Sequence, residues 1–165
     1  MTTPEPLVVP ADTAGPTIEP VAPGAARPRW SVMIPTYNCA AFLRQTLESV
    51  LAQDYPNIEY LVMDGGSTDN TLEVLKKYDA QLQWFSEKDR GQSHAINKGL
   101  RIATGDVIAY LNSDDVFETG ALYQVGKYYV SHPQARWVTG RCRFIDLKGK
   151  EIRKPITLYK YFWLL

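Results

Sequence analysis

The sequence predicts an α/β fold in which an open, mostly parallel, Rossmann-like sheet is covered by helices on both faces. Between residues 30 and 111, short apolar segments alternate with segments whose apolar residues recur at helical spacing, in the order β-α-β-α-β-α-β. The segments that follow the predicted strands are polar and mostly acidic, whereas those that precede them look like ordinary turns. Connections between parallel strands are almost always right-handed, so few topologies fit this order.

The alternation can be followed element by element. The apolar run at 30–34 is a strand that Pro35 ends, and the next helix has Leu43 and Leu47 at helical spacing. Thr104 and Gly105 stop the third helix. The predicted elements are, in chain order, a strand at 30–34, a helix at 41–51, a strand at 58–63, a helix capped by Thr68 or Asp69, a strand at 82–85, a helix at 91–103 and a strand at 106–111.

Beyond Asp115 the pattern predicts a further helix and three short strands. The helix lies near 120–131 and the first strand at 137–139. A hairpin then pairs 143–146 with 151–154 around a Lys-Gly turn.

Residues 1–28 are predicted to be a disordered Pro/Ala-rich tail, and residues 29–165 a single domain. The tail contains seven of the eleven prolines and no apolar period, so it cannot bury enough apolar surface to fold. It lacks the features of a secretory signal, and no segment approaches the ~20 apolar residues that span a bilayer. The two cysteines, Cys39 and Cys142, have no metal-site spacing. We therefore expect a cytoplasmic protein, free or peripheral at the inner face of the membrane, and its net charge of zero gives no reason to expect a nucleic-acid partner.

Polar loops follow all four predicted strands. In open α/β sheets, ligands bind beyond the carboxyl ends of the strands, where such loops meet. The sequence therefore predicts a functional cleft there, formed by residues 35–38, 64–69, 87–92 and 112–115.

The adjacent acidic residues Asp114 and Asp115 are the strongest metal-binding candidates. Two neighbouring carboxylates repel each other unless a cation compensates, and hard divalent cations bind between carboxylates and substrate phosphates. A solvated turn that caps the next helix is the alternative, but the position after a buried strand favours the metal. No GxGxxG or P-loop motif is present, so a bound diphosphate would need a metal to neutralise its charge.

Several other residues allow both a functional and a structural interpretation. Asp64 and the following Gly65-Gly66 could approach a base or ribose, or could form the loop before a helix. The Tyr37 ring could stack on a nucleobase or belong to the core. The remaining candidates are interpreted mainly as surface or solvated helix positions: Arg90, His94, Lys98 and Arg101.

In these same stretches the sequence resembles the family-2 glycosyltransferases of the GT-A fold. The matching segments are 31–38, 64–69, and the region from Glu87 to Asp115, with a looser match through 138–140 and 145–146. The resemblance implies metal-dependent, inverting transfer of a sugar from a UDP-, GDP- or dTDP-sugar to an acceptor hydroxyl. Glycans or lipid-linked molecules are the implied acceptors, and polysaccharide biosynthesis is the implied setting.

The resemblance also assigns roles to individual residues. Asp114 and Asp115 correspond to the acidic motif, with Asp115 the preferred ligand of Mg²⁺ or Mn²⁺ and Asp114 also near the donor. Two departures stand out, since many relatives have an acidic residue at Gly65 and at Asn112. The remaining donor-binding positions are Pro35, Thr36, Tyr37 and Asp64 around the nucleoside and Asp89 near the ribose or sugar phosphate.

No general base is identified in the sequence. Glu118 and Asp146 are weak candidates, and the chain closes on the apolar residues 161–165. We expect a protein truncated before its acceptor-binding half, whose exposed apolar end would favour self-association. A non-catalytic nucleotide-binding module is the alternative function. A sugar-1-phosphate nucleotidyltransferase would carry a Gly-rich, basic loop where residues 35–38 stand.

Overall fold

The computed structural model describes residues 27–140, 142–146 and 148–153. The described residues up to Pro133 form one unit, and those from Gln134 onward form a second. The predicted tail lies outside the described residues apart from Arg27 and Pro28, and so does the apolar closing segment.

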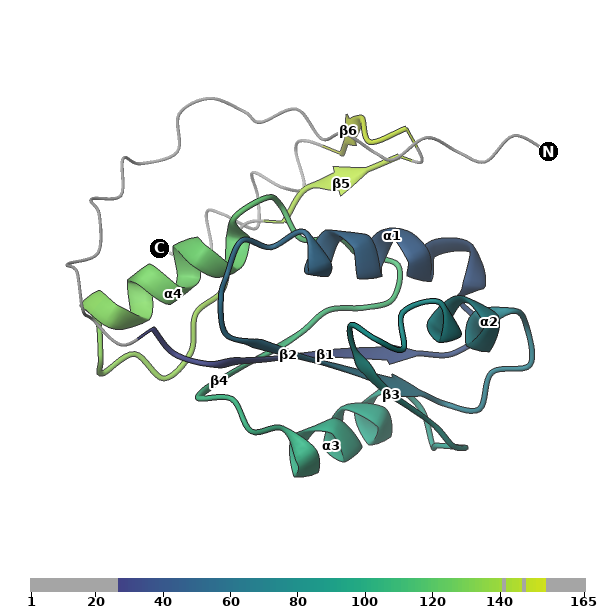
Figure 1. The fold of residues 1–165 in the computed structure, drawn as a ribbon. Helices are drawn as coiled ribbons and strands as arrows, with labels where there is room; N and C mark the ends of the chain where they lie inside the picture. The colour runs from purple at the N-terminus through teal and green to yellow at the C-terminus, as the bar shows by residue number, and fades with distance from the viewer. Residues whose placement is uncertain (1–26, 141, 147, 154–165) are drawn as a thin grey trace. The chain divides into compact units, whose positions relative to one another are not determined.

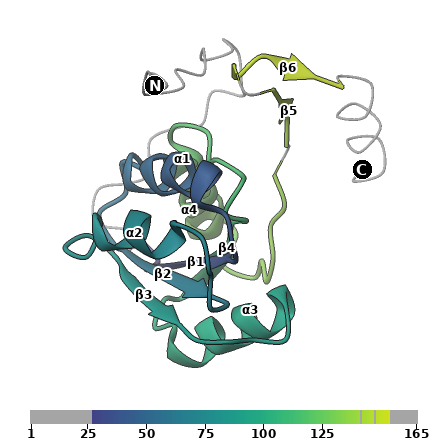
Figure 2. The ribbon, with the colours of Figure 1, turned by 90° about the vertical axis from the view of Figure 1, so that its right-hand side faces the viewer.

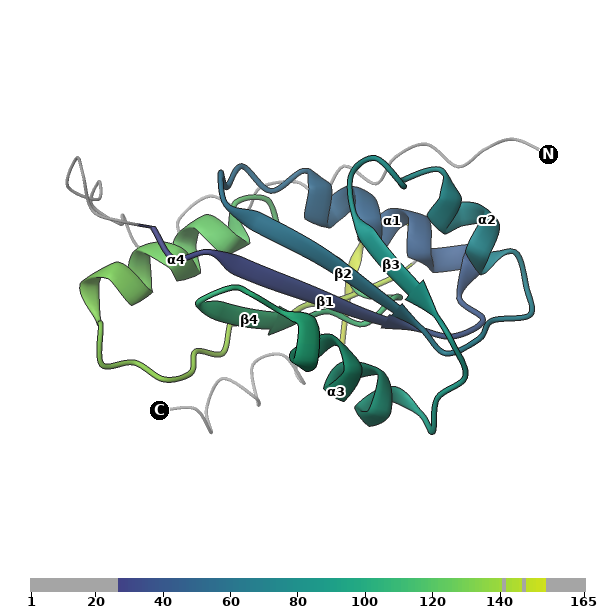
Figure 3. The same ribbon diagram turned by 60° about the horizontal axis from the view of Figure 1, so that its bottom comes forward.

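A parallel sheet of four strands organises the first unit, as predicted (Figure 1). The strands are β1 (Trp30–Thr36), β2 (Ile58–Asp64), β3 (Gln83–Ser86) and β4 (Val107–Tyr110). Their spatial order is β3-β2-β1-β4, so the first strand in the chain lies inside the sheet (Figure 3). Trp30 of β1 is in register with Ile58 of β2 on one side and with Val107 of β4 on the other.

Helices cover both faces of this sheet, which confirms the predicted fold class. The helices are α1 (Ala40–Leu51), α2 (Thr71–Lys76), α3 (Gln92–Ile102) and α4 (Ala121–Ser131). Figures 1 and 2 show α1, α2 and α4 on one side of the sheet and α3 on the other. None of the helices in the described part of the chain is long and apolar enough to cross a membrane.

The two-sided burial of β1 explains its mostly apolar sequence. Successive side chains of a strand point to opposite faces. Val32 and Ile34 join the main apolar cluster with Leu43 and Leu47 of α1. Met33 points the other way, where its sulfur contacts α3. A strand buried on both faces favours apolar residues on both, as is found in parallel sheets. The two polar residues of β1, Ser31 and Thr36, are buried as well.

Two predicted features are wrong. β1 does not end before Pro35 but continues through it, because β4 stops pairing with β1 at Met33 and only β2 remains beside the proline. A missing N–H is tolerated where one edge of the strand is unpaired. The predicted strand at 137–139 is irregular, and Trp137 in it is 75% exposed.

The second unit contains the predicted hairpin. Strands β5 (Phe144–Ile145) and β6 (Glu151–Ile152) pair antiparallel. The turn between them is closed by Asp146, whose carboxylate accepts the N–H groups of Lys148 and Lys150 at 2.9 Å.

Gly105, in the turn before β4, gives a direct test of this packing. A Cβ on Gly105 would lie 2.5 Å from the backbone nitrogen of Ser31 and 2.7 Å from the carbonyl carbon of Trp30, and neither atom can rotate away. The variant Gly105→Ala is therefore expected to lower the free energy of unfolding by about 1–3 kcal/mol, measured by urea denaturation. Gly140→Ala is the control, because its Cβ would meet nothing within 4 Å. Equal stability of the two variants would contradict the close approach of this turn to β1.

Candidate functional site

A cleft of about 840 Å³ opens at the carboxyl ends of the strands, at the edge of the sheet where the sequence predicted one. Four loops and the start of α3 contribute to its wall. The lining residues are Pro35, Thr36, Tyr37, Cys39, Gly65, Gly66, Thr68, Lys88, Asp89, Gly91, Gln92, Ala95, Asn112, Ser113 and Asp114. The structure thus brings together five of the predicted site residues, whereas Asp64 and Asp115 are not part of the lining.

The end of β1 contributes Thr36, whose hydroxyl is buried, and the aromatic ring of Tyr37 to the wall of the cleft. The Thr36 side chain is only 4% exposed, and its hydroxyl has no hydrogen-bond partner among the described residues. A buried polar group without a partner is unfavourable, so a ligand in the cleft could stabilise it. Tyr37 is 61% exposed, which excludes the alternative that its ring belongs to the core.

Asp64 lies behind the cleft wall and holds the loop that follows β2. It is buried, and its Oδ2 accepts the N–H groups of Gly66 and Ser67 at 3.0 Å and the hydroxyl of Ser86 at 2.6 Å. The Ser67 hydroxyl donates to Oδ1. Both carboxylate oxygens are therefore occupied by the chain itself, and the residue shapes the Gly-Gly loop.

Asn38 joins the first two loops of the cleft. Its backbone has a φ of 48°, in the left-handed region that asparagine tolerates better than most residues. This conformation lets its N–H donate to the Ser67 hydroxyl at 2.8 Å while its Oδ1 accepts the Thr68 N–H at 2.8 Å. These hydrogen bonds therefore connect the loop after β1 to the loop after β2.

The Asp69 carboxylate accepts hydrogen bonds from the first turns of two helices. Its carboxylate accepts the N–H of Ala40 at 3.1 Å, at the start of α1, and that of Thr71 at 3.0 Å, at the start of α2. The hydrogen bond from the Thr71 side chain, helped by these N–H groups, lowers the pKa of the Asp69 carboxyl below its usual value. A lowered pKa in the folded state stabilises the fold at neutral pH, and this contribution is lost as the pH falls through that pKa.

The carboxylate of Asp89 lies over Gly65. Its Oδ1 accepts the N–H of Gly91 at 2.8 Å, and its Oδ2 is 2.9 Å from the position that a Cβ on Gly65 would take. The missing side chain at position 65 therefore leaves the space that Asp89 occupies in the cleft.

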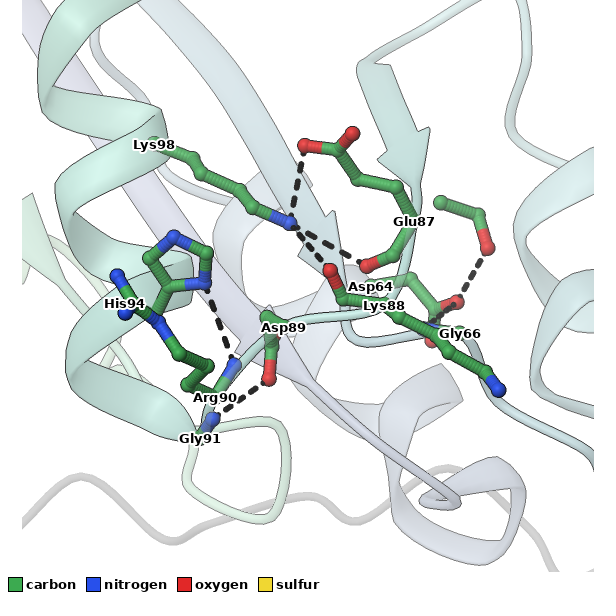
Figure 4. A network of polar contacts seen from close by, with 10 residues as sticks. Asp64, Gly66, Glu87, Lys88, Asp89, Arg90, Gly91, His94 and Lys98 are labelled. Carbon is green, nitrogen blue, oxygen red and sulfur yellow. Dashed lines mark hydrogen bonds and ion pairs between the residues drawn. The ribbon is translucent and has the colours of Figure 1, made fainter.

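Lys98 is not the solvated helix charge that the sequence suggested. Its side chain is 13% exposed, and its Nζ lies 2.9 Å from the carboxylate of Glu87. The same ammonium donates to the backbone carbonyls of Glu87 at 3.3 Å and Lys88 at 3.2 Å (Figure 4). The hydrogen bond and the charge of Lys98 hold the pKa of the Glu87 carboxyl below its usual value. Two of the three partners are backbone atoms, for which a sequence carries no signal.

The two carboxylates of the acidic pair after β4, Asp114 and Asp115, differ in their hydrogen bonds. Asp114 is exposed and lines the cleft, and no group of the described chain bonds to its carboxylate. Asp115 instead accepts the side-chain N–H of Asn112 at 2.9 Å.

Sequence reasoning missed Thr46 of α1, which fixes the loop that carries this pair. The Thr46 hydroxyl lies 2.9 Å from the carbonyl oxygen of Ser113 and 2.8 Å from that of Asp115.

The donor set of the pair suits a hard divalent cation, which binds carboxylate oxygen and completes its shell with substrate oxygens or water. Within the described residues, no group of three or more His, Cys, Asp or Glu side chains could hold a metal.

The structure supports neither of the two weak candidates for the general base. Glu118 does not line the cleft, and the Asp146 carboxylate is used in its own turn.

Comparison with known proteins relates this site to one enzyme family. The sequence model described as glycosyl transferase family 2 matches residues 31–164. An uncharacterized glycosyltransferase of Nostoc sp. is 37% identical over 121 residues, which cover 71% of this chain and 36% of that protein.

Two solved structures share the fold. S. aureus TarS 1-349 in complex with UDP-GlcNAc has a TM-score of 0.59 and 29% identity, covering 64% of this chain and 32% of that one. The mannosyltransferase PcManGT from Pyrobaculum calidifontis, in complex with GDP-Man and Mn²⁺, has a TM-score of 0.59 and 32% identity, covering 63% and 33%. This chain therefore spans about a third of the length of the Nostoc protein, of the TarS 1-349 chain and of the mannosyltransferase chain.

Proposed function

The chain belongs to glycosyl transferase family 2, as the resemblance in its sequence predicted, and on that basis we propose that its cleft binds the nucleoside diphosphate of a sugar donor. The observation that carries the proposal is the convergence of Tyr37, Asp89 and Asp114 on one cleft, from loops that follow three different strands. The volume of about 840 Å³ lies within the range of small-molecule sites. Similar proteins in complex with UDP-GlcNAc and with GDP-Man support a donor of this class.

The nucleoside occupies the side of the cleft formed by β1 and β2. Tyr37 offers an exposed ring on which a base can stack. The Thr36 hydroxyl can hydrogen bond with the base or ribose and thereby gain the partner that it lacks. Asp89 offers carboxylate oxygens to a ribose hydroxyl, and Asp64 acts from behind by holding the loop.

The acidic pair holds a divalent cation, Mg²⁺ or Mn²⁺, together with the diphosphate. When bound, such a cation neutralises charge on the departing diphosphate. Asp114 is the favoured direct ligand, because its carboxylate lines the cleft and no described group bonds to it. Asp115 is tied to Asn112 and orients the loop. The solved relative in complex with both GDP-Man and Mn²⁺ supports a divalent cation alongside a donor of this class.

The reaction proposed for the whole enzyme is an inverting transfer. The oxygen of an acceptor hydroxyl, on a glycan or a lipid-linked molecule, bonds to the anomeric carbon as the bond between that carbon and the diphosphate breaks. The hydroxyl proton passes to a general base within hydrogen-bond reach, and no residue of the described chain is assigned that role.

Calorimetric titration of UDP, GDP and dTDP, each with and without Mn²⁺, tests the donor site. We expect one nucleotide to bind at least about tenfold more tightly than the other two, because hydrogen bonds to a single base discriminate by that order. Its binding should also strengthen with Mn²⁺. A chain that is folded by circular dichroism and binds none of the three would contradict the proposal. Binding without any release of sugar from the matching donor would favour the non-catalytic module instead.

A further inference from the structure

The loop between β3 and α3 carries Asp89 into the cleft, and contacts from α3 hold it on both sides. This loop has few backbone bonds of its own, and Gly91 in it has a φ of 104°. On the β3 side, Lys98 bonds to the carbonyls of Glu87 and Lys88. On the α3 side, the ring Nδ1 of His94 accepts the N–H of Arg90 at 3.2 Å.

The two contacting side chains come from one face of α3. His94 and Lys98 are four residues apart, a spacing that places side chains on the same side of a helix. Figure 4 shows both pointing toward the loop, with Asp89 between the segments that they contact. Within the loop, the N–H of Gly91 donates to the Asp89 carboxylate itself. At the start of the loop, the N–H of Glu87 donates to the Asp64 carbonyl at 3.1 Å.

Lys98 is well matched to its partners. An ammonium group has three N–H donors, and its nitrogen lies near three acceptors: one carboxylate oxygen and two carbonyl oxygens. The Lys98 side chain is mostly buried, whereas Glu87 and Lys88 are exposed.

We propose that Lys98 is a positioning residue for donor binding: it fixes the backbone at Glu87 and Lys88 and so holds the Asp89 carboxylate over Gly65. Lys98 does not line the cleft, and its effect passes through Asp89. The inference rests on the proposed function of the cleft as a nucleotide site, although the loop geometry can be tested without a ligand.

The test compares Lys98→Met, which keeps the long stem but removes the donors, with Lys98→Arg, which keeps the charge. Arg101→Met is the matched control, since Arg101 is an exposed cation in the last turn of α3 outside this network. Two quantities are measured: amide hydrogen exchange at Arg90 and Gly91 by NMR, and the affinity for the nucleotide that binds best with Mn²⁺.

In Lys98→Met we expect exchange at these amides to accelerate about tenfold and nucleotide affinity to fall about tenfold, as for the loss of a charged hydrogen bond. The pKa of the Glu87 carboxyl, measured by NMR, should rise toward its usual value. Lys98→Arg should recover part of both losses, and Arg101→Met should resemble the wild type.

A double-mutant cycle with Asp89→Asn separates positioning from general stabilisation. If Lys98 acts through Asp89, then Lys98→Met should cost little further affinity once Asp89 is changed. Independent, additive losses would overturn the proposal, and so would unchanged exchange and affinity in Lys98→Met. Should Lys98→Met fail to fold, Lys98→Gln takes its place, because the shorter neutral side chain cannot reach both carbonyls. Exchange at Gly91 that stays at the wild-type rate in that variant would overturn the proposal equally.

The outcomes also distinguish this inference from the proposed function. If the wild-type protein binds no nucleotide, the proposed function fails, and the exchange measurement alone decides whether Lys98 holds the loop. If the wild type binds and Lys98→Met binds equally well, the nucleotide site stands and the role of Lys98 is refuted.

Discussion

Asp64→Ala is expected to lower the free energy of unfolding by about 3–5 kcal/mol, because it removes a buried carboxylate on which a whole hydrogen-bond network depends. The N–H groups of Gly66 and Ser67 and the hydroxyl of Ser86 would all lose their acceptor. Urea denaturation measures the loss as a lower midpoint with an unchanged slope. Because Gly65 and Gly66 line the cleft, nucleotide binding should disappear as well.

Two further variants make this prediction specific. Asp64→Asn keeps the shape and one acceptor oxygen, so its loss should be smaller, about 2 kcal/mol. Asp54→Ala, in the exposed turn before β2, should stay within about 0.5 kcal/mol of the wild type. An Asp64→Ala protein as stable as Asp54→Ala would show that the loop after β2 does not depend on this carboxylate.

The second large effect is expected at the acidic pair. Asp114→Asn should weaken Mn²⁺-dependent nucleotide binding by at least about a hundredfold, because it removes the proposed direct ligand. Asp115→Asn should weaken it about tenfold, as is typical when a residue that orients a metal ligand is changed. We expect the smaller loss of binding for Asp115→Asn because the Asp115 carboxylate already accepts a hydrogen bond from Asn112.

Calorimetry on both variants, with and without Mn²⁺, measures this difference. Without metal the two variants should bind the nucleotide as weakly as the wild type does, and this serves as the control for intact folding. A larger loss in Asp115→Asn than in Asp114→Asn would contradict the assignment of Asp114 as the direct metal ligand. It would favour Asp115 instead, the ligand that the family resemblance implied. Equal binding in the presence and absence of Mn²⁺ in the wild type would argue against a metal in this cleft.

The sheet and its helices could be predicted because the spacing of apolar residues along the chain follows the buried faces of each strand and helix. The strand WSVMIPT carries apolar residues on both faces, since it is covered by α1 on one side and α3 on the other. Where burial stops, the prediction fails: the segment at 137–139 is apolar enough for a strand, yet the structure leaves Trp137 exposed. The end of β1 was misjudged at Pro35, because the cost of a proline depends on whether a neighbouring strand is present, and a sequence does not contain that information.

The cleft was predicted as a set of loops but not at the level of side chains. Asp64 and Asp89 are both acidic residues near strand ends, and nothing in their sequence context separates them. The structure buries the first behind the loop and leaves the second facing the cleft. The contacts of Thr46 and Lys98 could not be predicted, because both residues act on backbone carbonyls, and any residue type at the receiving position supplies the same atom.

The sheet order has a consequence for how the chain folds during synthesis. β1 is the first strand made, yet its partner β4 begins only at Val107. At about 5–20 residues per second, roughly two to nine seconds pass between completion of β2 and the appearance of β4. Throughout that interval one edge of an almost wholly apolar strand lacks its partner, and unpaired edges of this kind promote association between chains. A strand that lies inside the finished sheet is therefore an exposed, aggregation-prone edge of the nascent one.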